Sequence, residues 1–230
     1  MNKKGFTLAE LLIALGIIGA IAAMTIPSLM TSVNNKILAT KLKNNIQALE
    51  TLIGSQMIDN KTNDLSKTDF ADPDKLLTNK NFDTVKICTG DTAYKDCWKV
   101  KKAAEEEGAE DIAGDVSYKY LGNLDITKIP FGKHRTIIMK NGAIMNYNLC
   151  TVATQTHCTN DDIGFFDIDV NGNDGPNIVG RDAFTFLITK KGVIRGYDDS
   201  ADRATLVTKC KTGLGYCSSL VIQDNWKIKY

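Results

Sequence analysis

An uninterrupted apolar run constrains this chain more than any other feature of its sequence. The run extends from Phe6 to Ile26, and Glu10 is the only charged residue within it. As an α-helix it would be about 32 Å long, which matches the hydrocarbon core of a bilayer at about 30 Å. Lys3 and Lys4 precede the run, and the positive-inside rule keeps such lysines on the cytoplasmic side. The sequence therefore predicts a membrane-spanning helix, with everything after Ile26 exported.

The cysteines agree with an exported domain. They form three close pairs along the chain, which are Cys88 with Cys97, Cys150 with Cys158, and Cys210 with Cys217. None of these pairs has the tight Cys-x2-Cys or Cys-x4-Cys spacing of a thiolate zinc site. An even number of cysteines outside the cytoplasm favours disulfides, and each neighbour bridge would be worth on the order of 2.5 kcal/mol. We predict these three bridges, while exchanged partners are not excluded by the sequence.

The N-terminal pattern has a second interpretation, an ordinary secretory signal peptide removed at Ala20-Ile21-Ala22. Glu10 argues against it, because a carboxylate at mid-membrane costs roughly 2.5 to 3.5 kcal/mol and a simple export signal gains nothing from it. A solvated acid favoured by the helix dipole is a further alternative, but the neighbours of Glu10 are wholly apolar. An acid in such surroundings indicates a cationic partner.

The segment from Gly5 to Leu15 reads GFTLAELLIAL. It resembles the cleavage and methylation signature of type IV prepilins and of the pseudopilins of type II secretion. The resemblance implies that a membrane-embedded prepilin peptidase cuts after Gly5 and methylates the new amino terminus at Phe6. The leader, residues 1–5, would be removed, and the apolar helix would stay as membrane anchor and later as filament core.

Cleavage gives Glu10 a chemical role. Cutting before Phe6 creates an α-amino group with a reference pKa of about 8, which faces apolar surroundings. Glu10 lies one helical turn away, so its carboxylate can neutralise this amino group within one subunit or, as the resemblance implies, between neighbours in a staggered assembly. Either pairing removes two unpaired charges from an apolar environment.

A second helical pattern follows the apolar run. Pro27 should kink or loosen the preceding turn, and members of the family that the chain resembles often carry a proline here. Apolar residues then recur three or four positions apart; they are Val33, Ile37, Leu38, Leu42, Ile46, Leu49, Ile53 and Met57. We expect one helix of about 53 residues and roughly 80 Å. Residues 6–30 would be its membrane and filament-core part, and residues 31–59 its amphipathic part.

The remaining residues, 60–230, are predicted to form a disulfide-bonded head. Asn141-Gly142 separates two apolar segments, 136–140 and 143–147, and suits a type I′ hairpin turn. Residues 184–189 and 193–197 flank a Lys-Lys-Gly turn in the same way. The expected fold class is α+β, with the long N-terminal helix packed on a C-terminal antiparallel sheet, as in pilins.

Between and before these hairpins, other segments carry weaker signals. Residues 61–83 read as a loop or a short irregular helix, and residues 99–111 are charged and helix-forming. Residues 167–175 read DIDVNGNDG, with alternating oxygen-bearing side chains and a glycine in the sixth place, as at the start of an EF-hand loop. The twelfth place is Ile178 instead of glutamate, so an EF-hand is not expected.

A calcium clip is one interpretation of this acidic segment, since some secretion pseudopilins bind calcium in the head. Its ligands would be Asp167, Asp169, Asn171, Asn173 and Asp182. The competing interpretation is a turn-rich loop in which these side chains satisfy the local backbone.

Composition and motifs argue against several other functions. The 28 basic and 27 acidic residues leave a net charge of +1, so the chain has no basic footprint for binding nucleic acid. The only imidazoles are His134 and His157, and no nucleophile elbow, phosphate-binding loop or zinc-protease motif occurs. The sequence does not predict an enzyme.

We expect a structural subunit of a type IV pilus-like or type II secretion pseudopilus filament. Its partners would be other copies of the chain and related pilins, a prepilin peptidase, an inner-membrane assembly platform and the lipid bilayer. It would cross the cytoplasmic membrane once, with its N-terminus in the cytoplasm, before joining a periplasmic or extracellular filament. The alternative is a low-abundance minor pilin that acts as a tip adhesin or ligand-binding module.

Overall fold

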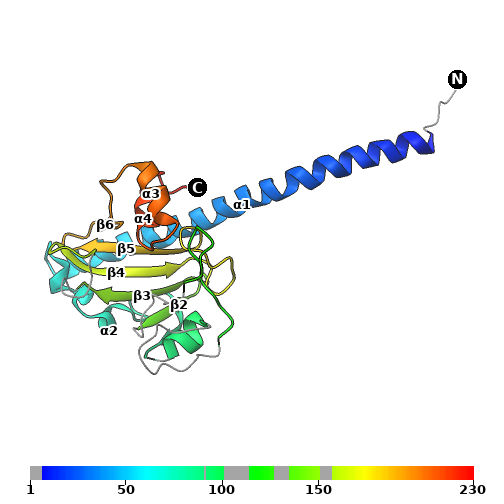
Figure 1. The fold of residues 1–230 in the computed structure, drawn as a ribbon. Helices are drawn as coiled ribbons and strands as arrows, with labels where there is room; N and C mark the ends of the chain where they lie inside the picture. The colour runs from blue at the N-terminus through cyan, green and yellow to red at the C-terminus, as the bar shows by residue number, and fades with distance from the viewer. Residues whose placement is uncertain (1–6, 91, 101–113, 127–134, 151–156) are drawn as a thin grey trace, which may run out of the picture.

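The computed structural model describes residues 7–90, 92–100, 114–126, 135–150 and 157–230. A long N-terminal helix runs into a head built on a six-stranded antiparallel sheet, with a pair of short helices near the C-terminus (Figure 1). The predicted α+β class, with a long helix against an antiparallel sheet, is confirmed.

The long helix, α1, extends over Leu8–Asp59, so its end agrees with the predicted one. It continues through Pro27, although proline offers no N–H to the carbonyl one turn before it. The Thr31 hydroxyl donates to the Pro27 carbonyl oxygen at 3.0 Å. Only the C-terminal half of α1 contacts the head, while the N-terminal half extends away from it (Figure 1).

The buried face of α1 begins at Leu38. Its buried apolar residues recur at helical spacing; they are Leu38, Ala39, Leu42, Ile46, Leu49, Leu52 and Ile53. Val33 and Ile37, which the predicted stripe included, are about half exposed, so the buried stripe is shorter at its N-terminal end than predicted. Two polar residues complete the face. Asn45 accepts a hydrogen bond from Asn141 at 2.7 Å, and Gln56 donates one to Asp69 at 3.0 Å.

Leu42 provides a test of how firmly α1 is held, because its side chain is fully buried. We expect Leu42→Ala to lower the free energy of unfolding by about 3 kcal/mol, through lost burial and the cavity it leaves. Ile37→Ala, five residues earlier and half exposed, is the matched control, with an expected loss below about 1 kcal/mol. Chemical denaturation of the full chain in detergent micelles measures both. Equal losses would contradict the described packing.

The sheet follows the order of the sequence, with each strand antiparallel to the next. Its strands are β1 (Thr84–Cys88), β2 (Thr136–Met139), β3 (Ile144–Leu149), β4 (Asp162–Asp169), β5 (Ala183–Thr189) and β6 (Ile194–Arg195). Both predicted hairpins are present, as β2 with β3 and β5 with β6. The strand β6 is shorter than predicted, because the Gly196 N–H turns to the Asp199 carboxylate at 3.1 Å.

The turn between β2 and β3 corrects one detail of the prediction. A type I′ turn requires positive φ at both central residues, but of Asn141 and Gly142 only the glycine has positive φ, at +87°. The Gly142 N–H donates to the Met139 carbonyl at 2.9 Å. This is a three-residue loop whose glycine occupies the left-handed position. The turn between β5 and β6 repeats it, with Gly192 at φ +81° and its N–H on the Thr189 carbonyl.

The sheet has one apolar and one mixed face. On the apolar face Tyr147, Phe166 and Phe186 are cross-strand partners. Phe70 packs edge-on against Tyr147 and Phe166, with ring centroids 5.9 and 6.4 Å away, and Trp226 lies 5.9 Å from Phe186. The buried residues of α1 belong to this same core. The opposite face contains polar side chains and is described with the site.

The connections are short and capped. The predicted irregular region 61–83 contains η1 (Leu65–Lys67), η2 (Asp69–Ala71) and α2 (Pro73–Leu76), which begin after the side-chain caps Asp64, Thr68 and Asp72. The helix-forming segment 99–111 lies almost wholly outside the described residues. A π-helical turn, η3 (Ala93–Trp98), and two helices, α3 (Arg203–Cys210) and α4 (Tyr216–Gln223), were not predicted.

Candidate functional site

The N-terminal half of α1 is a bare apolar shaft. None of its residues from Leu8 to Ile37 is buried. Its large apolar side chains are at least 48 % exposed; they are Leu8, Leu11, Leu12, Ile13, Leu15, Ile17, Ile18, Ile21, Met24, Ile26, Leu29, Met30, Val33 and Ile37. A contiguous apolar surface of this size marks an interaction site. Among the described residues, α1 is the one helix long and apolar enough to cross a membrane.

Glu10 closes the start of the shaft through reciprocal hydrogen bonds with Thr7. The backbone N–H and the hydroxyl of Thr7 both donate to Glu10 Oε2 at 2.8 Å, and the Glu10 N–H donates to Thr7 Oγ1 at 3.2 Å. Such a capping box satisfies amide groups that a first helical turn leaves without intrahelical partners. The helix therefore begins at Leu8, after the predicted cleavage point.

Gly5 and Phe6 lie outside the described residues, so cleavage and methylation at this bond stay predictions. The structure places Glu10 as the third residue of α1, exposed on the shaft. The ion pairs found within the described part of the chain do not include Glu10. Its carboxylate thus has only Thr7 as a partner there, and a cation from elsewhere can reach it.

The glycines of the shaft serve no packing contact within the described chain. A β-carbon added at Gly16 or Gly19 would meet no atom within 4 Å, whereas one at Gly164 in β4 would lie 2.4 Å from the Tyr147 ring. Small residues on an exposed helix permit close approach of another helix. Pro27 lies on the same exposed surface.

The six cysteines pair with their neighbours in the chain. Cys88 and Cys97 join β1 to η3, and their Cα atoms are 6.2 Å apart. Cys150 and Cys158, 5.7 Å apart, join the end of β3 to the segment before β4, and Cys210 and Cys217, 4.8 Å apart, join α3 to α4. These are the pairs that the short separations favour. Each bridge links segments of the head that are close in the chain and so restrains the unfolded chain.

Asp167 and Asp169 belong to β4 and not to a loop. Their alternation, which suggested a calcium loop, is the two-residue repeat of a strand whose alternate side chains share one face. Asp167 is 1 % exposed and lies in a buried polar row across the sheet. The row consists of Thr136, Asn146, Asp167 and Thr185, which are successive cross-strand partners.

The electrostatics of this row are unfavourable for a charged carboxylate. The Thr185 hydroxyl donates to Asp167 Oδ1 at 2.6 Å, while Oδ2 has no hydrogen-bond partner among the described residues. Burial raises the pKa of Asp167 to about 7, although the hydrogen bond from Thr185 acts in the opposite direction. A carboxyl in this environment is largely protonated below pH 7.

Asp169 and Asp182 form a buried acidic pair. Asp169 accepts hydrogen bonds from the Tyr118 hydroxyl at 2.8 Å and the Asn171 N–H at 3.1 Å. Asp182 accepts the N–H groups of Asn177 and Ile178 at 2.7 and 2.6 Å. Burial raises the pKa of Asp182 to about 6, and burial together with the charge of Asp182 raises the pKa of Asp169 well above its ordinary value.

The donor set only partly fits a calcium ion. The carboxylates of Asp169 and Asp182 are engaged with local N–H and O–H donors, as in a turn-rich loop. Asn173 donates to the Cys97 carbonyl at 2.9 Å, and the Oδ1 atoms of Asn171 and Asn173 lack partners among the described residues. In that part of the chain, no three histidine, cysteine or acidic side chains are grouped to hold a metal ion. Calcium binding stays a prediction.

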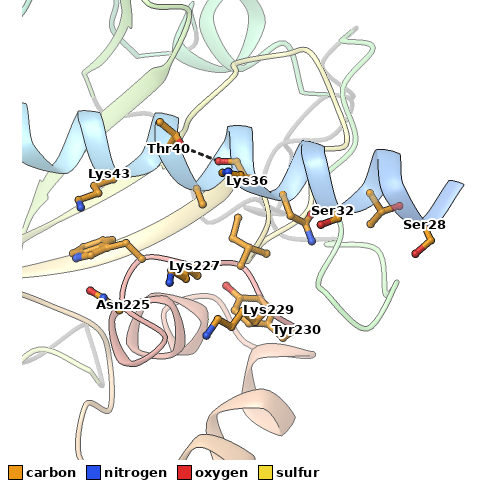
Figure 2. A pocket seen from close by; sticks show the side chains of 14 residues that line it. Ser28, Ser32, Lys36, Thr40, Lys43, Asn225, Lys227, Lys229 and Tyr230 are labelled. Atoms are coloured by element: carbon orange, nitrogen blue, oxygen red, sulfur yellow. Dashed lines mark hydrogen bonds between the residues drawn. The ribbon is translucent and has the colours of Figure 1, made fainter. Parts of the chain in front are cut away.

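A groove of about 800 Å³ lies between α1 and the C-terminal segment, where the shaft enters the head (Figure 2). One wall is the α1 surface from Ser28 to Lys43, and the other is the segment Asn225–Tyr230. Four lysines line it, two on each wall; they are Lys36, Lys43, Lys227 and Lys229. Sequence reasoning missed this groove because its walls are almost two hundred residues apart in the chain.

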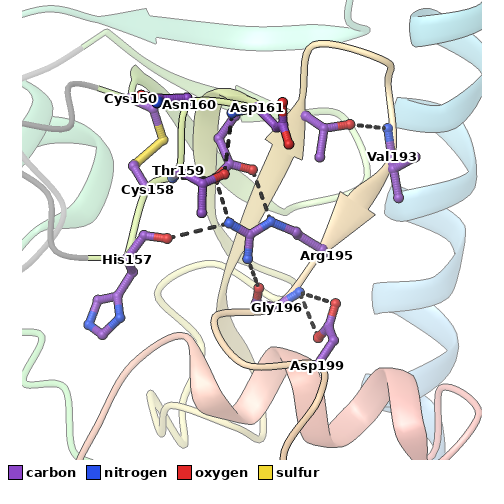
Figure 3. A network of polar contacts seen from close by, with 12 residues as sticks. Cys150, His157, Cys158, Thr159, Asn160, Asp161, Val193, Arg195, Gly196 and Asp199 are labelled. Carbon is purple, nitrogen blue, oxygen red and sulfur yellow. Dashed lines mark hydrogen bonds and ion pairs between the residues drawn. A yellow bond between two sulfur atoms is a disulfide. The ribbon is translucent and has the colours of Figure 1, made fainter.

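A polar network joins the residues around the start of β4, from His157 to Asp162, to β6 (Figure 3). Arg195 donates through Nε to Asp162 Oδ1 at 2.9 Å, forms an ion pair with Oδ2, and donates to the Gly196 carbonyl at 2.9 Å. Thr159 donates to Asp162 through its N–H at 2.7 Å and its hydroxyl at 2.8 Å. Burial opposes the charge, but hydrogen bonds from Arg195 and Thr159 lower the pKa of Asp162.

His157 is next to this network and packs against two tyrosine rings, those of Tyr197 and Tyr216. Its ring stacks on Tyr197 with centroids 4.2 Å apart. Burial, followed by the positive charges of Arg195 and Lys209, lowers the pKa of His157 below its ordinary value. His134, the other imidazole, lies outside the described residues.

The Arg195–Asp162 pair allows a test of the network. Arg195→Met should lower the free energy of unfolding by about 3 kcal/mol, because it leaves the buried Asp162 carboxylate without its cation. Adding Asp162→Asn should recover part of the loss. The control is Lys140→Met, which breaks an exposed pair with Asp83 and should cost less than about 1 kcal/mol. Thermal unfolding of the full chain in micelles measures all variants, and an Arg195→Met loss no larger than the control would reject this role.

Comparison with known proteins finds a family match for the N-terminal segment. Residues 1–26 match the family model described as the prokaryotic N-terminal methylation motif, the signature of type IV prepilins and pseudopilins. The resemblance of residues 5–15 to that signature is confirmed. No curated protein and no solved structure matches the chain. The motif, the free apolar helix and the α+β head together have the architecture of a pilin-like precursor.

Proposed function

We propose that this chain is a structural subunit of a type IV pilus-like or type II secretion pseudopilus filament. A prepilin peptidase cuts it between Gly5 and Phe6 and methylates the new terminus. The free half of α1 holds the product in the cytoplasmic membrane, with the head on the exported side. Subunits then leave the membrane and pack through this same shaft.

The bare shaft carries the proposal. From Leu11 to Met24 its residues are apolar on every side of the helix and none is buried, which suits either lipid or a bundle of like helices. A soluble tether would gain nothing from this surface. The head does not need it, because its core is completed by residues from Leu38 onward. One shaft can therefore exchange lipid for other shafts while the head stays folded.

The glycines and Glu10 fit the packed state. Gly16 and Gly19 leave open surface where another helix can approach closely. Glu10, exposed at the start of the shaft, can meet the α-amino group of a neighbour displaced along the axis. Such contact neutralises both charges in an environment without water.

Mass spectrometry of the native protein tests the processing step. The expected product begins at Phe6 and carries one methyl group on its amino nitrogen. A chain that begins after Ala22 would indicate an ordinary signal peptide, and one that still carries Met1 would show no processing; either would contradict the proposal. Purified filaments test the assembly step, for which we expect the chain as the repeating component. A trace amount would indicate a minor tip subunit instead.

A further inference from the structure

The basic groove between α1 and the C-terminal segment has a charge pattern suited to an anion. The residues that line it include Lys36, Lys43, Lys227 and Lys229 but no acidic side chain. All four lysines are exposed. Within the described part of the chain, none of them forms an ion pair. Four unpaired ammonium groups around one hollow attract phosphate or carboxylate groups.

Neutral donors accompany the lysines. Ser28, Ser32 and Asn35 lie on the α1 wall and Asn225 on the opposite wall. Figure 2 shows Ser28 and Ser32 at the end of the groove that points toward the N-terminus of α1, with lysine side chains from both walls farther along it. Hydroxyl and amide donors next to ammonium groups match the oxygen atoms of a phosphate ester.

The walls of the groove are held in place by the core. The Trp226 ring packs on Phe186, and the backbone N–H of Trp226 donates to the Val221 carbonyl at 2.7 Å. Ile228, between the two C-terminal lysines, is 7 % exposed. The opposite wall is the continuous helix α1. The lysines therefore project from two fixed supports.

We propose that this groove binds the phosphate groups of anionic phospholipids at the outer surface of the membrane, and so seats the head before assembly. The proposal rests on the proposed membrane anchoring of α1. It adds a lipid-headgroup site on the head that the N-terminal motif does not imply.

The position of the groove along α1 selects lipid as its occupant. No charged residue occurs between Glu10 and Lys36. Lys36 lies about 9 Å along the helix from Met30, the last residue of the predicted membrane part. Helical side chains tilt toward the N-terminus, and lysine stems extend over apolar surface toward the interface. The headgroup layer is about 6 Å thick on each side of the hydrocarbon, so the Lys36 ammonium group reaches the phosphates.

The C-terminal wall lies at the same end of the head. Figure 1 places the C-terminus beside α1 where the shaft leaves the head. Lys227 and Lys229 are thus near the membrane when the shaft spans it. A polybasic patch next to a span gains electrostatic attraction from each lysine near an anionic surface, and salt weakens it.

Trp226 reports on the groove, since it lines the hollow. The full chain is reconstituted into vesicles of phosphatidylcholine, or of phosphatidylcholine with phosphatidylglycerol, each containing lipid with a nitroxide on the headgroup. We expect quenching of tryptophan fluorescence to be at least twofold stronger in the phosphatidylglycerol vesicles, and to fall as salt is raised. Trp98 is fully buried and gives a constant background, which a Trp226→Phe variant measures.

Two double variants with equal charge change decide the role of the lysines. Lys227→Gln with Lys229→Gln should reduce quenching in phosphatidylglycerol vesicles to the level in phosphatidylcholine. Lys80→Gln with Lys191→Gln should not. Lys80 lines a hollow beside Asp59, and Lys191 precedes Gly192, which lies against Ile53 and Met57. Both control lysines are therefore at the far end of α1.

The remaining outcomes separate the alternatives. Equal quenching in the two lipids, or no change in the first double variant, would overturn the inference. Loss of the difference on adding millimolar inorganic phosphate would show a site for free phosphate, and dependence on protein density at fixed lipid would show contact with a second copy; both would reject the lipid. Resistance of the reconstituted chain to alkaline extraction is measured in parallel. A chain that is extracted refutes the proposed anchoring, whereas a resistant chain without lipid-dependent quenching refutes only this inference.

Discussion

Replacing Glu10 by glutamine is expected to lower filament yield at least tenfold while leaving membrane insertion intact. The α-amino group created by cleavage would enter the packed shafts without a counter-ion, and an unpaired charge in an apolar environment costs several kcal/mol. Glutamine is informative because it keeps the capping box: its amide oxygen can still accept from Thr7 as Glu10 does. A loss of filaments in Glu10→Gln would therefore be due to the missing charge and not to a missing helix cap.

Two further variants complete this test. Glu10→Val removes both charge and cap and should assemble as poorly as Glu10→Gln. Thr7→Ala removes the hydroxyl cap but keeps the acid, so it should form filaments at near wild-type yield, since a lost cap costs only about 1 kcal/mol. Electron microscopy of sheared filaments gives the yield, and membrane fractionation checks insertion. Normal filaments from Glu10→Gln would reject the proposed role of the carboxylate.

Much of α1 could be predicted from the sequence because its signals are local. The apolar run, the helical spacing of Leu42, Ile46 and Leu49, and the end at Asp59 depend on residues within a few turns of one another. Asn-Gly marked the β2–β3 hairpin for the same reason, although the turn type was wrong. The structure places only Gly142 in the left-handed region, since the loop has three residues instead of two.

The strand β4 could not be predicted because it lies in the middle of the sheet. Its residues are buried on both faces, so IGFFDID shows no alternation of apolar and polar positions. The two acids at its end were taken for the start of a loop. Both acids are buried next to hydrogen-bond donors from distant segments of the chain. Thr185 donates to Asp167, and Tyr118 donates to Asp169. No local pattern encodes such contacts.

The same reasoning applies to the groove and to the helices α3 and α4. The helices are eight residues each and have little amphipathic pattern. The short Cys210–Cys217 spacing was the only local indication that these two segments lie next to each other. The lysines of the groove read as ordinary solvated residues in both segments. Their grouping depends on the C-terminal segment returning to α1 through the contact of Trp226 with Phe186.

The second large effect concerns Asp167. We expect Asp167→Asn to raise the free energy of unfolding by on the order of 4 kcal/mol at pH 8, and to change it little at pH 4. Burial raises the pKa of this carboxyl to about 7 in the folded chain, from an ordinary value of 3.8. The protonated form is therefore favoured by folding. Its contribution is fully present below about pH 4 and is lost as the pH rises through 7.

The wild-type head should thus lose stability between about pH 4 and 7, a direction opposite to that of ordinary acid denaturation. The pKa values of Asp169 and Asp182 are also raised, so these two acids act in the same direction. The free energy of unfolding of Asp167→Asn should therefore still fall as the pH rises, but less steeply than that of the wild type. Exposed Asp174→Asn has the same charge change and is the control, with an expected effect within about 0.5 kcal/mol. Denaturant unfolding of the full chain in micelles, at a series of pH values, measures all three proteins.

The sign of the result also bears on the calcium prediction. Without a cation, the Oδ2 atom of Asp167 has no partner among the described residues, and removing its charge must stabilise the fold at high pH. With a calcium ion bound, the same carboxylate would be a ligand, and Asp167→Asn would destabilise the chain at pH 8. A chelator would then lower the melting temperature of the wild type but not of the variant. Destabilisation without any effect of chelator would contradict both accounts of Asp167.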